Sequence, residues 1–239
     1  MNIDFSGQVV VVAGGTGGLG QAVSLGFLEA GARVIVTYRK EGEFRALTEL
    51  AGANRSALEG HAVDVTDASA VAAMMKTIFA EHGVVDALVN TVGGYAGGVT
   101  LWDLETKVFD RMLALNLCSG YMLARAVLPE MLKAGHGAIV NVAAKAAFDH
   151  GAGAAAYAAS KAAAVALMDS LAADCKGTGV RVNSILPRII DTAANREAMP
   201  GSDFSTWPKP EDIARVILFL SSDVAKTIHG AAIPVYGNS

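Results

Sequence analysis

The sequence predicts a single α/β domain, doubly wound around a mostly parallel sheet of about seven strands. Short apolar runs alternate with longer amphipathic segments along the whole chain. The apolar runs are continuous rather than mixed with polar residues, which is typical of parallel strands covered on both faces. No linker, repeat or low-complexity segment interrupts this alternation. We therefore expect residues 1–239 to form one domain.

Each expected element follows from a local pattern. The apolar runs predict strands over residues 8–14, 32–38, 60–65, 84–90, 138–143, 180–186 and 231–237. Helical periodicity predicts helices over residues 18–30, 67–82, 104–133, 153–176 and 211–221. Thr66 or Asp67 is expected to cap the second helix, and Pro210 to precede the last. Residues 189–208 show no clear periodicity, and because long loops in compact domains are usually functional, we expect a substrate lid there.

Composition excludes several classes of partner. The net charge is −4 and no basic run occurs, so nucleic acid is not an expected partner. Cys118 and Cys175 lie in apolar helical patterns and are expected to be buried free thiols in a reducing compartment. We found neither a signal peptide nor a run near the roughly 18 apolar residues that span a bilayer. A soluble cytoplasmic protein is expected, and no metal ligand is predicted.

The turn after the first strand is expected to bind the pyrophosphate of a dinucleotide. The segment VVVVAGGTGGLGQAV carries Gly14, Gly18 and Gly20, with Thr16 and Leu19 between them. Glycines allow a tight turn and let backbone N–H groups approach a phosphate, and the following helix N-terminus adds partial positive charge. A purely structural turn is the alternative, but the position between strand and helix favours binding.

The glycine spacing resembles that of the short-chain dehydrogenase/reductase family, with Ala13 in place of the family's threonine. The resemblance continues in order through nearly the whole chain and implies a Rossmann domain that binds NAD(P). The further matching positions are Asp64 and Val65 (adenine contact), Asn90 and Gly93 (N-N-A-G motif), Asn116 (helix asparagine), Tyr157 and Lys161 (Y-x-x-x-K), and Pro187 and Thr192 (P-G…T stretch). Arg188 stands where the last motif has glycine.

The end of the second strand indicates which dinucleotide is used. An acidic residue there accepts from the ribose hydroxyls and favours NAD. This chain has Tyr38-Arg39-Lys40 instead, and Arg39 can pair with a 2′-phosphate. NADP(H) is therefore favoured, with NAD(H) as the alternative if these basic residues are merely solvated.

Tyr157 and Lys161 are the expected catalytic pair. At positions i and i+4 they project from one face of a helix. The ordinary tyrosine pKa near 10 is too high for easy proton exchange at pH 7, and we expect the nearby ammonium to lower the pKa of Tyr157. The resemblance implies that Tyr157 donates a proton, that Lys161 also holds the nicotinamide ribose, and that Asn116 helps hold a water. An ordinary helix asparagine is the alternative for Asn116.

The family's serine is missing. Its usual position, thirteen residues before Tyr157, is occupied by Ala144, and Ala143 offers no hydroxyl either. Loss of one donor to the oxygen where charge develops typically costs about 10²–10³ in rate. An ordinary carbonyl reductase would therefore be impaired.

One branch of the family lacks this serine, the quinonoid dihydropteridine reductases, and three segments resemble it. They are GGYAGG at 93–98, AAKAAFDHGAGAAAYAASK at 143–161, and DTAANREAMPGSDFSTW at 191–207. Tyr95, Ala144 and Trp207 become candidate substrate contacts, with Tyr95 either stacked on a flat ring or packed under the lid. A conjugated ring disperses charge over several heteroatoms, so it needs no dedicated oxyanion donor. Two departures are Arg39, where that branch is acidic and prefers NADH, and the retained Asn116.

Three functions remain open from the sequence. The first is an NAD(P)H-dependent reductase of a small conjugated substrate, with a quinonoid dihydropterin as a candidate. The second is a ketone or 3-oxoacyl-thioester reductase, and the third is a non-catalytic dinucleotide sensor. The family also implies a homodimer or homotetramer through helices 104–133 and 153–176, which carry more apolar surface than one sheet face needs.

Overall fold

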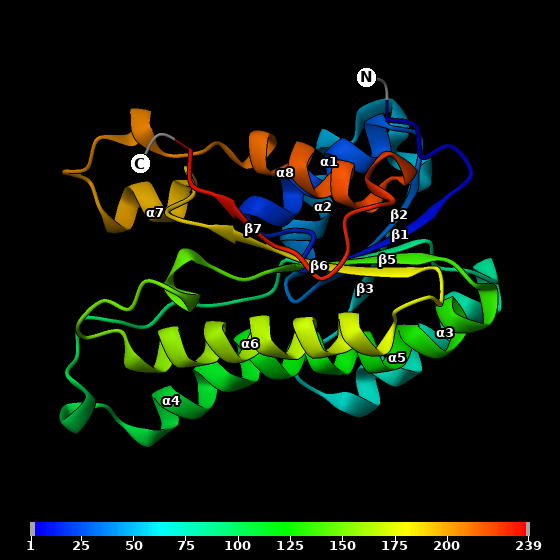
Figure 1. Cartoon of the computed structure of the whole chain (residues 1–239). Helices are drawn as coiled ribbons and strands as arrows, with labels where there is room; N and C mark the ends of the chain where they lie inside the picture. The colour runs from blue at the N-terminus through cyan, green and yellow to red at the C-terminus, as the bar shows by residue number, and fades with distance from the viewer. Residues whose placement is uncertain (1–2, 238–239) are drawn as a thin grey trace.

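A seven-stranded sheet runs through the middle of the molecule and has helices on both faces (Figure 1). The computed structural model describes residues 3–237. The strands are β1 (Val9–Ala13), β2 (Arg33–Tyr38), β3 (Leu58–Ala62), β4 (Ala87–Asn90), β5 (Gly137–Val142), β6 (Val180–Pro187) and β7 (Ala232–Val235). Their order in the sheet is β3-β2-β1-β4-β5-β6-β7. All seven predicted strands are confirmed, and every neighbouring pair is parallel.

The helices form two layers. They are α1 (Gly18–Glu29), α2 (Glu41–Leu50), α3 (Ala68–His82), α4 (Thr106–Leu113), α5 (Ser119–Ala134), α6 (Ala155–Asp174), α7 (Ala193–Ala198) and α8 (Pro210–Ser221). In Figure 1, α1, α2 and α8 lie on the upper face of the sheet and α3, α5 and α6 on the lower face. All five residues of β1 are buried, with Val10 and Val12 packed into one layer and Val9 and Val11 into the other. This two-sided burial explains the continuous apolar runs.

Several helix predictions need correction. The helix expected over 104–133 is interrupted, because a π-helical turn at Ala114–Cys118 joins α4 to α5. No helix was predicted at α2, a ten-residue helix that fully buries only Leu47. The expected loop at 189–208 contains α7 and a short 3₁₀ turn at Phe204–Thr206.

The structure shows how α3 and α8 begin. Asp67 caps α3, because its carboxylate accepts from the backbone N–H groups of Ser69 and Ala70. Thr66 is therefore not the cap. Pro210 is the first residue of α8, a position that needs no N–H donor.

The structure changes two expectations, one about the cysteines and one about a membrane-spanning segment. Both cysteines are free thiols, but only Cys175 is buried and Cys118 is half-buried. Within residues 3–237, the continuous helical stretch Thr106–Ala134 is long and apolar enough to cross a membrane by length and composition alone. Its α5 part buries Leu123, Val127 and Met131 in the core against the sheet.

Candidate active site

Two adjoining pockets lie at the carboxyl ends of the central strands. The first has a volume of about 240 Å³ and the second about 210 Å³. Both are lined by Thr91, Gly93 and Gly94, which follow β4, so the two pockets form one trough. The strand order reverses between β1 and β4, the place where doubly wound sheets usually bind ligands.

The glycine turn forms one wall of the first pocket. Gly14 and Thr16 line it, and Gly14 has a φ of +73°, which favours glycine. A Cβ on Gly20 would collide with the carbonyl oxygen of Gly14, so the turn can close only with glycine there. Gly18 lies against the Thr192 side chain, with no room for a Cβ between them, and Leu19 is buried in the core.

Arg39, Asp64 and Val65 line the far end of the first pocket. Arg39 is exposed and makes no ion pair with any residue from 3 to 237. The hydroxyl and N–H of Thr66 donate to Asp64 and hold the pKa of its carboxyl below the usual value, with a smaller contribution from Arg39. Glu43, which the sequence reading missed, also lines this end and carries a second negative charge.

Tyr157, Lys161, Ala144 and Pro187 line the second pocket together. The residues that the sequence predicted for catalysis and for the missing serine therefore meet at one place. The same pocket includes Arg188, which was noted only as a departure from a motif. It also includes further residues that the sequence reading did not single out, among them Val142, Ile190 and Asn195.

Burial shifts the pKa values of Tyr157 and Lys161 in opposite directions. Burial, with Tyr95 nearby, raises the pKa of Tyr157 to about 12. Burial also lowers the pKa of Lys161 to about 8. The expected lowering of the Tyr157 pKa is wrong for the protein without ligand. The Lys161 ammonium instead donates to the Val142 carbonyl oxygen at 2.9 Å.

Tyr95 packs edge-on against Tyr157, with 5.0 Å between ring centroids and 75° between the planes. It remains 70% exposed, so it does not pack under the lid. Tyr95 lines neither pocket, although its largely exposed ring lies against Tyr157 of the second pocket.

Asn116 ties the loop after β4 to α6. Its Oδ1 accepts from the N–H of Gly94 at 2.9 Å, and its Nδ2 donates to the Gly94 carbonyl and the Ser160 hydroxyl, both at 3.0 Å. A Cβ on Gly93 would lie 2.9 Å from Asn116 Oδ1 and 3.1 Å from Lys161 Nζ. Gly93 is therefore required for the asparagine and the lysine to lie this close.

Three further predicted residues line neither pocket. Asn90 is buried and donates to Asn141 at 3.0 Å, which fixes the start of the loop after β4. Thr192 caps α7 by accepting from the Asn195 N–H. Trp207 is only 7% exposed, and its ring lies 4.9 Å from that of Phe204.

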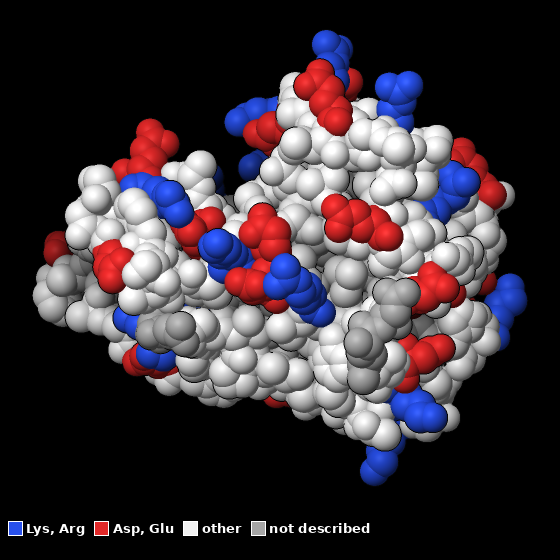
Figure 2. Space-filling view, turned by 90° about the horizontal axis from the view of Figure 1, so that it is seen from above, with Lys and Arg blue, Asp and Glu red and all other residues white. Residues whose placement is uncertain are grey.

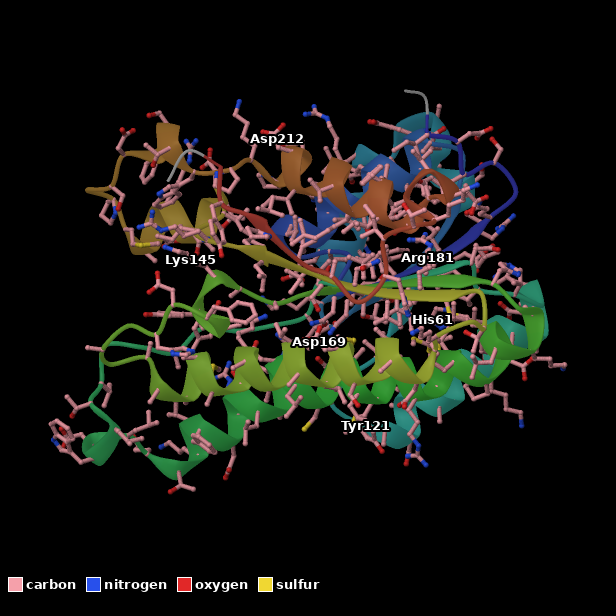
Figure 3. All side chains as sticks on the ribbon, in the orientation of Figure 1. His61, Tyr121, Lys145, Asp169, Arg181 and Asp212 are labelled. Atoms are coloured by element: carbon pink, nitrogen blue, oxygen red, sulfur yellow. The ribbon has the colours of Figure 1, made fainter. Side chains whose placement is uncertain are left out.

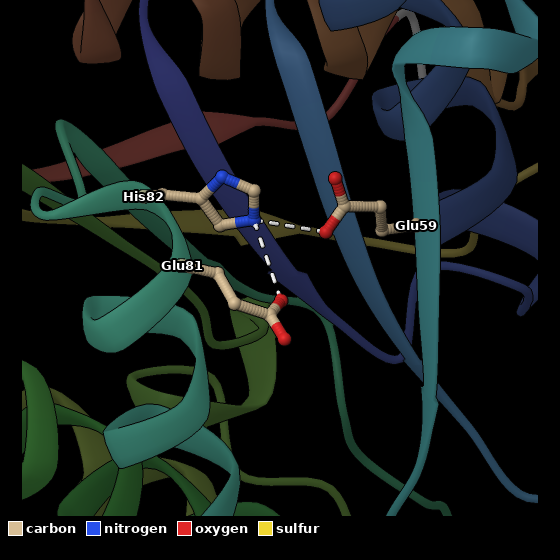
Figure 4. A group of neighbouring side chains, drawn as sticks. All are labelled: Glu59, Glu81 and His82. Carbon is tan, nitrogen blue, oxygen red and sulfur yellow. Dashed lines mark hydrogen bonds and ion pairs between the residues drawn. The ribbon is translucent and has the colours of Figure 1, made fainter.

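A group of titratable side chains that lines neither pocket lies at the edge of the sheet, beside β3 (Figure 4). His82 Nε2 lies 2.9 Å from Glu59 and 4.0 Å from Glu81. Arg33 also pairs with Glu59 at 2.7 Å. The guanidinium already occupies the carboxylate that a metal ion would need, so this group is an ion-paired edge.

On the face shown in Figure 2, Lys and Arg side chains are interspersed with Asp and Glu. That face has no large region of one sign.

Comparison with known proteins agrees with this geometry. The family described as short chain dehydrogenase matches residues 8–202. The chain is 35% identical to a D-threitol dehydrogenase of Mycolicibacterium smegmatis, over 99% of this chain and 96% of that protein. It is 32% identical to a 3-oxoacyl-[acyl-carrier-protein] reductase of Vibrio harveyi, over 99% of this chain and 98% of that protein.

Two solved structures have the same fold. A short-chain type dehydrogenase/reductase from Mycobacterium ulcerans superposes with a TM-score of 0.92 at 27% identity, covering 98% of this chain and 90% of that one. The structure of ElxO with NADP bound gives a TM-score of 0.91 at 25% identity, covering 96% and 97%. The family match over residues 8–202 and these relatives place the chain in the short-chain dehydrogenase family, whose members are NAD(P)-dependent oxidoreductases.

Proposed function

We propose that this protein is an NADP(H)-dependent reductase of a small conjugated acceptor, with Tyr157 as the proton donor. The observation that carries the proposal is that Tyr157, Lys161 and Ala144 line one pocket, which adjoins the pocket lined by Arg39. A proton donor without the usual hydroxyl partner thus lies beside a place for a dinucleotide phosphate.

The first pocket fits the cofactor. Gly14, Thr16 and Gly17 line it directly before the N-terminus of α1, which is where the fold would hold a pyrophosphate. Asp64 and Val65 would contact the adenosine half, and Arg39 a 2′-phosphate. When bound, the reduced cofactor supplies a hydride. We place Gly93, Pro187 and Thr192 along its nicotinamide half, because the first two line the second pocket and Thr192 touches Gly18.

Tyr157 is suited to give a proton rather than take one. With a pKa of about 12 its phenol is protonated at neutral pH. As hydride adds to the acceptor carbon, the phenol O–H bond breaks and the proton passes to the acceptor heteroatom. The phenolate that remains is stabilised by Lys161, four residues away on the same helix face. Asn116 keeps the surrounding loop in place through Gly94 and Ser160.

Ala144 bears on the class of acceptor. It is buried in the pocket wall and presents a methyl group where the family has a hydroxyl. A conjugated acceptor, such as a quinonoid dihydropterin, spreads the developing charge and depends less on that donor. The sequence of the 191–207 lid supports the same class, and Tyr95 would stack on a flat ring with its open face.

A ketone or 3-oxoacyl-thioester reductase is the second candidate. The relatives at 35% and 32% identity, a D-threitol dehydrogenase and a 3-oxoacyl-[acyl-carrier-protein] reductase, favour it. In that case water or another donor in the second pocket replaces the missing hydroxyl.

The purified protein with NADPH distinguishes these functions. Rapid oxidation of NADPH by a quinonoid dihydropterin supports the first candidate. Activity restricted to ketones, and about tenfold or more higher in Ala144→Ser, supports the second. Tight NADPH binding without turnover on either substrate indicates a non-catalytic sensor. Full activity in Tyr157→Phe would refute Tyr157 as the proton donor.

A further inference from the structure

Arg188 occupies the pocket wall at the position where the family motif has glycine. It follows Pro187 at the end of β6 and lines the second pocket with Tyr157 and Lys161. A glycine there offers only backbone, whereas arginine adds a guanidinium with five N–H donors in a planar fork. The substitution therefore changes the chemistry of the substrate half of the site.

The second pocket has positive charge and no carboxylate to balance it. Lys161 and Arg188 are its two charged lining residues, although the chain as a whole has a net charge of −4. The rest of the wall combines apolar side chains such as Val142, Ala144 and Ile190 with polar and backbone groups. Arg188 is itself exposed, so an anion that enters the pocket meets two cations and no lining carboxylate that would offset their attraction.

The nearest carboxylates are already paired with other cations. Asp149 pairs with Lys145 at 2.8 Å, and Asp191 pairs with Arg196. Lys145, labelled in Figure 3, comes from the loop after β5. The pKa of Asp149 is lowered mainly by Lys145, with a smaller effect of Arg188. Arg188 is thus close enough to sense Asp149 but has no ion pair within residues 3–237.

Arg188 differs from the other donors of the pocket in having no partner among residues 3–237. Lys161 donates to the Val142 carbonyl at 2.9 Å, and the Asn195 side chain donates to the Ile190 carbonyl at 2.8 Å, although each keeps further N–H groups. Arg188 makes no side-chain hydrogen bond with any residue between 3 and 237. Its whole guanidinium is therefore free for a ligand.

The position of Arg188 separates it from the cofactor's phosphates. The glycine turn and Arg39, which would hold the pyrophosphate and a 2′-phosphate, line the first pocket, and Arg188 does not. Its partner therefore belongs to the molecule that enters beside Tyr157.

We propose that Arg188 binds a carboxylate or phosphate of the substrate, so that the natural acceptor is a small anion that is held by this group while Tyr157 delivers the proton. This inference rests on the proposed function, because it assumes that the second pocket receives the acceptor. It narrows the substrate class, since a neutral pterin would leave the guanidinium without a partner.

The test is a binding measurement that does not depend on turnover. Acetoacetate and its neutral methyl ester are titrated calorimetrically into the protein saturated with NADP⁺, a complex that cannot reduce them. We expect the wild type to bind the acid at least roughly tenfold more tightly than the ester, as for a charge-assisted hydrogen-bonded pair. Arg188→Met should bring the ratio of the affinities for acid and ester close to one, and Arg188→Lys should restore part of the preference for the acid. A phosphate-bearing probe, acetonyl phosphate, then ranks the two anions.

Arg215→Met is the matched control, because Arg215 is exposed on α8, pairs with Asp212 and lines neither pocket. It should leave the ratio unchanged. The inference is overturned if the ester binds as well as the acid, if neither binds, or if Arg188→Met keeps the ratio. It is also overturned if that variant loses NADP⁺ affinity by the same factor, since Arg188 would then hold the cofactor.

The two proposals fail separately. Binding of acid that depends on Arg188, without turnover of any acceptor, would keep the anion site and refute the reductase. The opposite result is turnover that depends on Tyr157 but is equal for the acid and the ester, both in the wild type and in Arg188→Met. That result would support the reductase and refute the anion site.

Discussion

At the scale of single residues, burial disfavours the charged forms of both Tyr157 and Lys161. Lys161 is 5% exposed, and a buried ammonium is costly even with one carbonyl partner. The lysine is therefore held at the expense of folding stability, as is common for functional groups.

Replacing Lys161 should therefore stabilise the protein without ligand. A pKa of about 8 instead of 10.5 corresponds to about 3 kcal/mol of unfavourable free energy at pH 7, from roughly 1.4 kcal/mol per pKa unit. We expect Lys161→Met to raise the free energy of unfolding by up to that amount while abolishing reduction. Urea unfolding at pH 7 measures the first effect.

The pH dependence of the free energy of unfolding shows whether charge burial causes this gain in stability. Between pH 8 and 10.5 the unfolded chain holds a proton on Lys161 that the folded chain has lost, so wild-type stability gains with rising pH. The advantage of Lys161→Met should thus be largest below pH 8 and vanish by about pH 10.5. A constant advantage over that range would mean that packing, not charge burial, is responsible.

Arg39 gives a second prediction at this scale. If it pairs with a 2′-phosphate, Arg39→Ala should lower kcat/KM for NADPH by roughly 10- to 100-fold and leave that for NADH almost unchanged. Arg215→Ala is the control, since Arg215 pairs with Asp212 on α8 and lines neither pocket. Equal losses with both cofactors would assign Arg39 to the adenosine rather than to the phosphate.

The sequence predicted which residues form the site better than it predicted their pKa values and hydrogen-bond partners. The i, i+4 spacing was enough to place Tyr157 and Lys161 in one pocket. The direction of the Tyr157 pKa was not predictable, because it depends mainly on burial of the phenol in the folded protein, with a smaller effect of Tyr95 from the loop after β4. The lysine's partner, the Val142 carbonyl, comes from β5 and was equally invisible in the sequence.

At the scale of elements, the glycine turn joins β1 to α1 by steric necessity. A Cβ at Gly20 would meet the backbone of Gly14, whereas one at Gly17 would lie 3.4 Å from the same carbonyl oxygen, an ordinary contact. Gly17 and Gly20, three residues apart, therefore differ sharply in whether they tolerate an added Cβ.

Gly20→Ala should cost about 1–3 kcal/mol of stability through overpacking and weaken NADPH binding at least tenfold by displacing the turn. Gly26→Ala is the control on the same helix and should change both by much less, because its Cβ would lie 3.4 Å from the Leu218 side chain and Gly26 lines neither pocket. Thermal unfolding and fluorescence titration with NADPH measure the two effects. Equal behaviour of the two variants would mean that the turn can open without loss of the site.

The elements that the sequence missed share a physical reason. α2 fully buries only Leu47, and within α7 no residue is buried, so both are short helices that lie mostly outside the core. The π turn at Ala114–Cys118 keeps the apolar pattern of its neighbours, so α4 and α5 were predicted as one helix. Strong two-sided burial, by contrast, made all seven strands predictable.

At the scale of the whole molecule, α5 and α6 form the outer layer on one face of the sheet (Figure 1). Tyr121 on α5 is 46% exposed and points away from the sheet in Figure 3. Leu132, on the same helix, is 44% exposed. Apolar side chains that a helix leaves outside its own core are often covered by another copy of the chain.

We therefore expect a homodimer or homotetramer that pairs through α5 and α6, because this layer would bury its exposed apolar side chains between copies. Tyr121→Glu would place a charge in that contact, and light scattering after gel filtration should show a smaller species. Leu50→Glu is the control, since Leu50 is 59% exposed on α2, on the opposite face of the sheet. A wild-type monomer, or a Tyr121→Glu protein of unchanged mass, would place the contact elsewhere or exclude it.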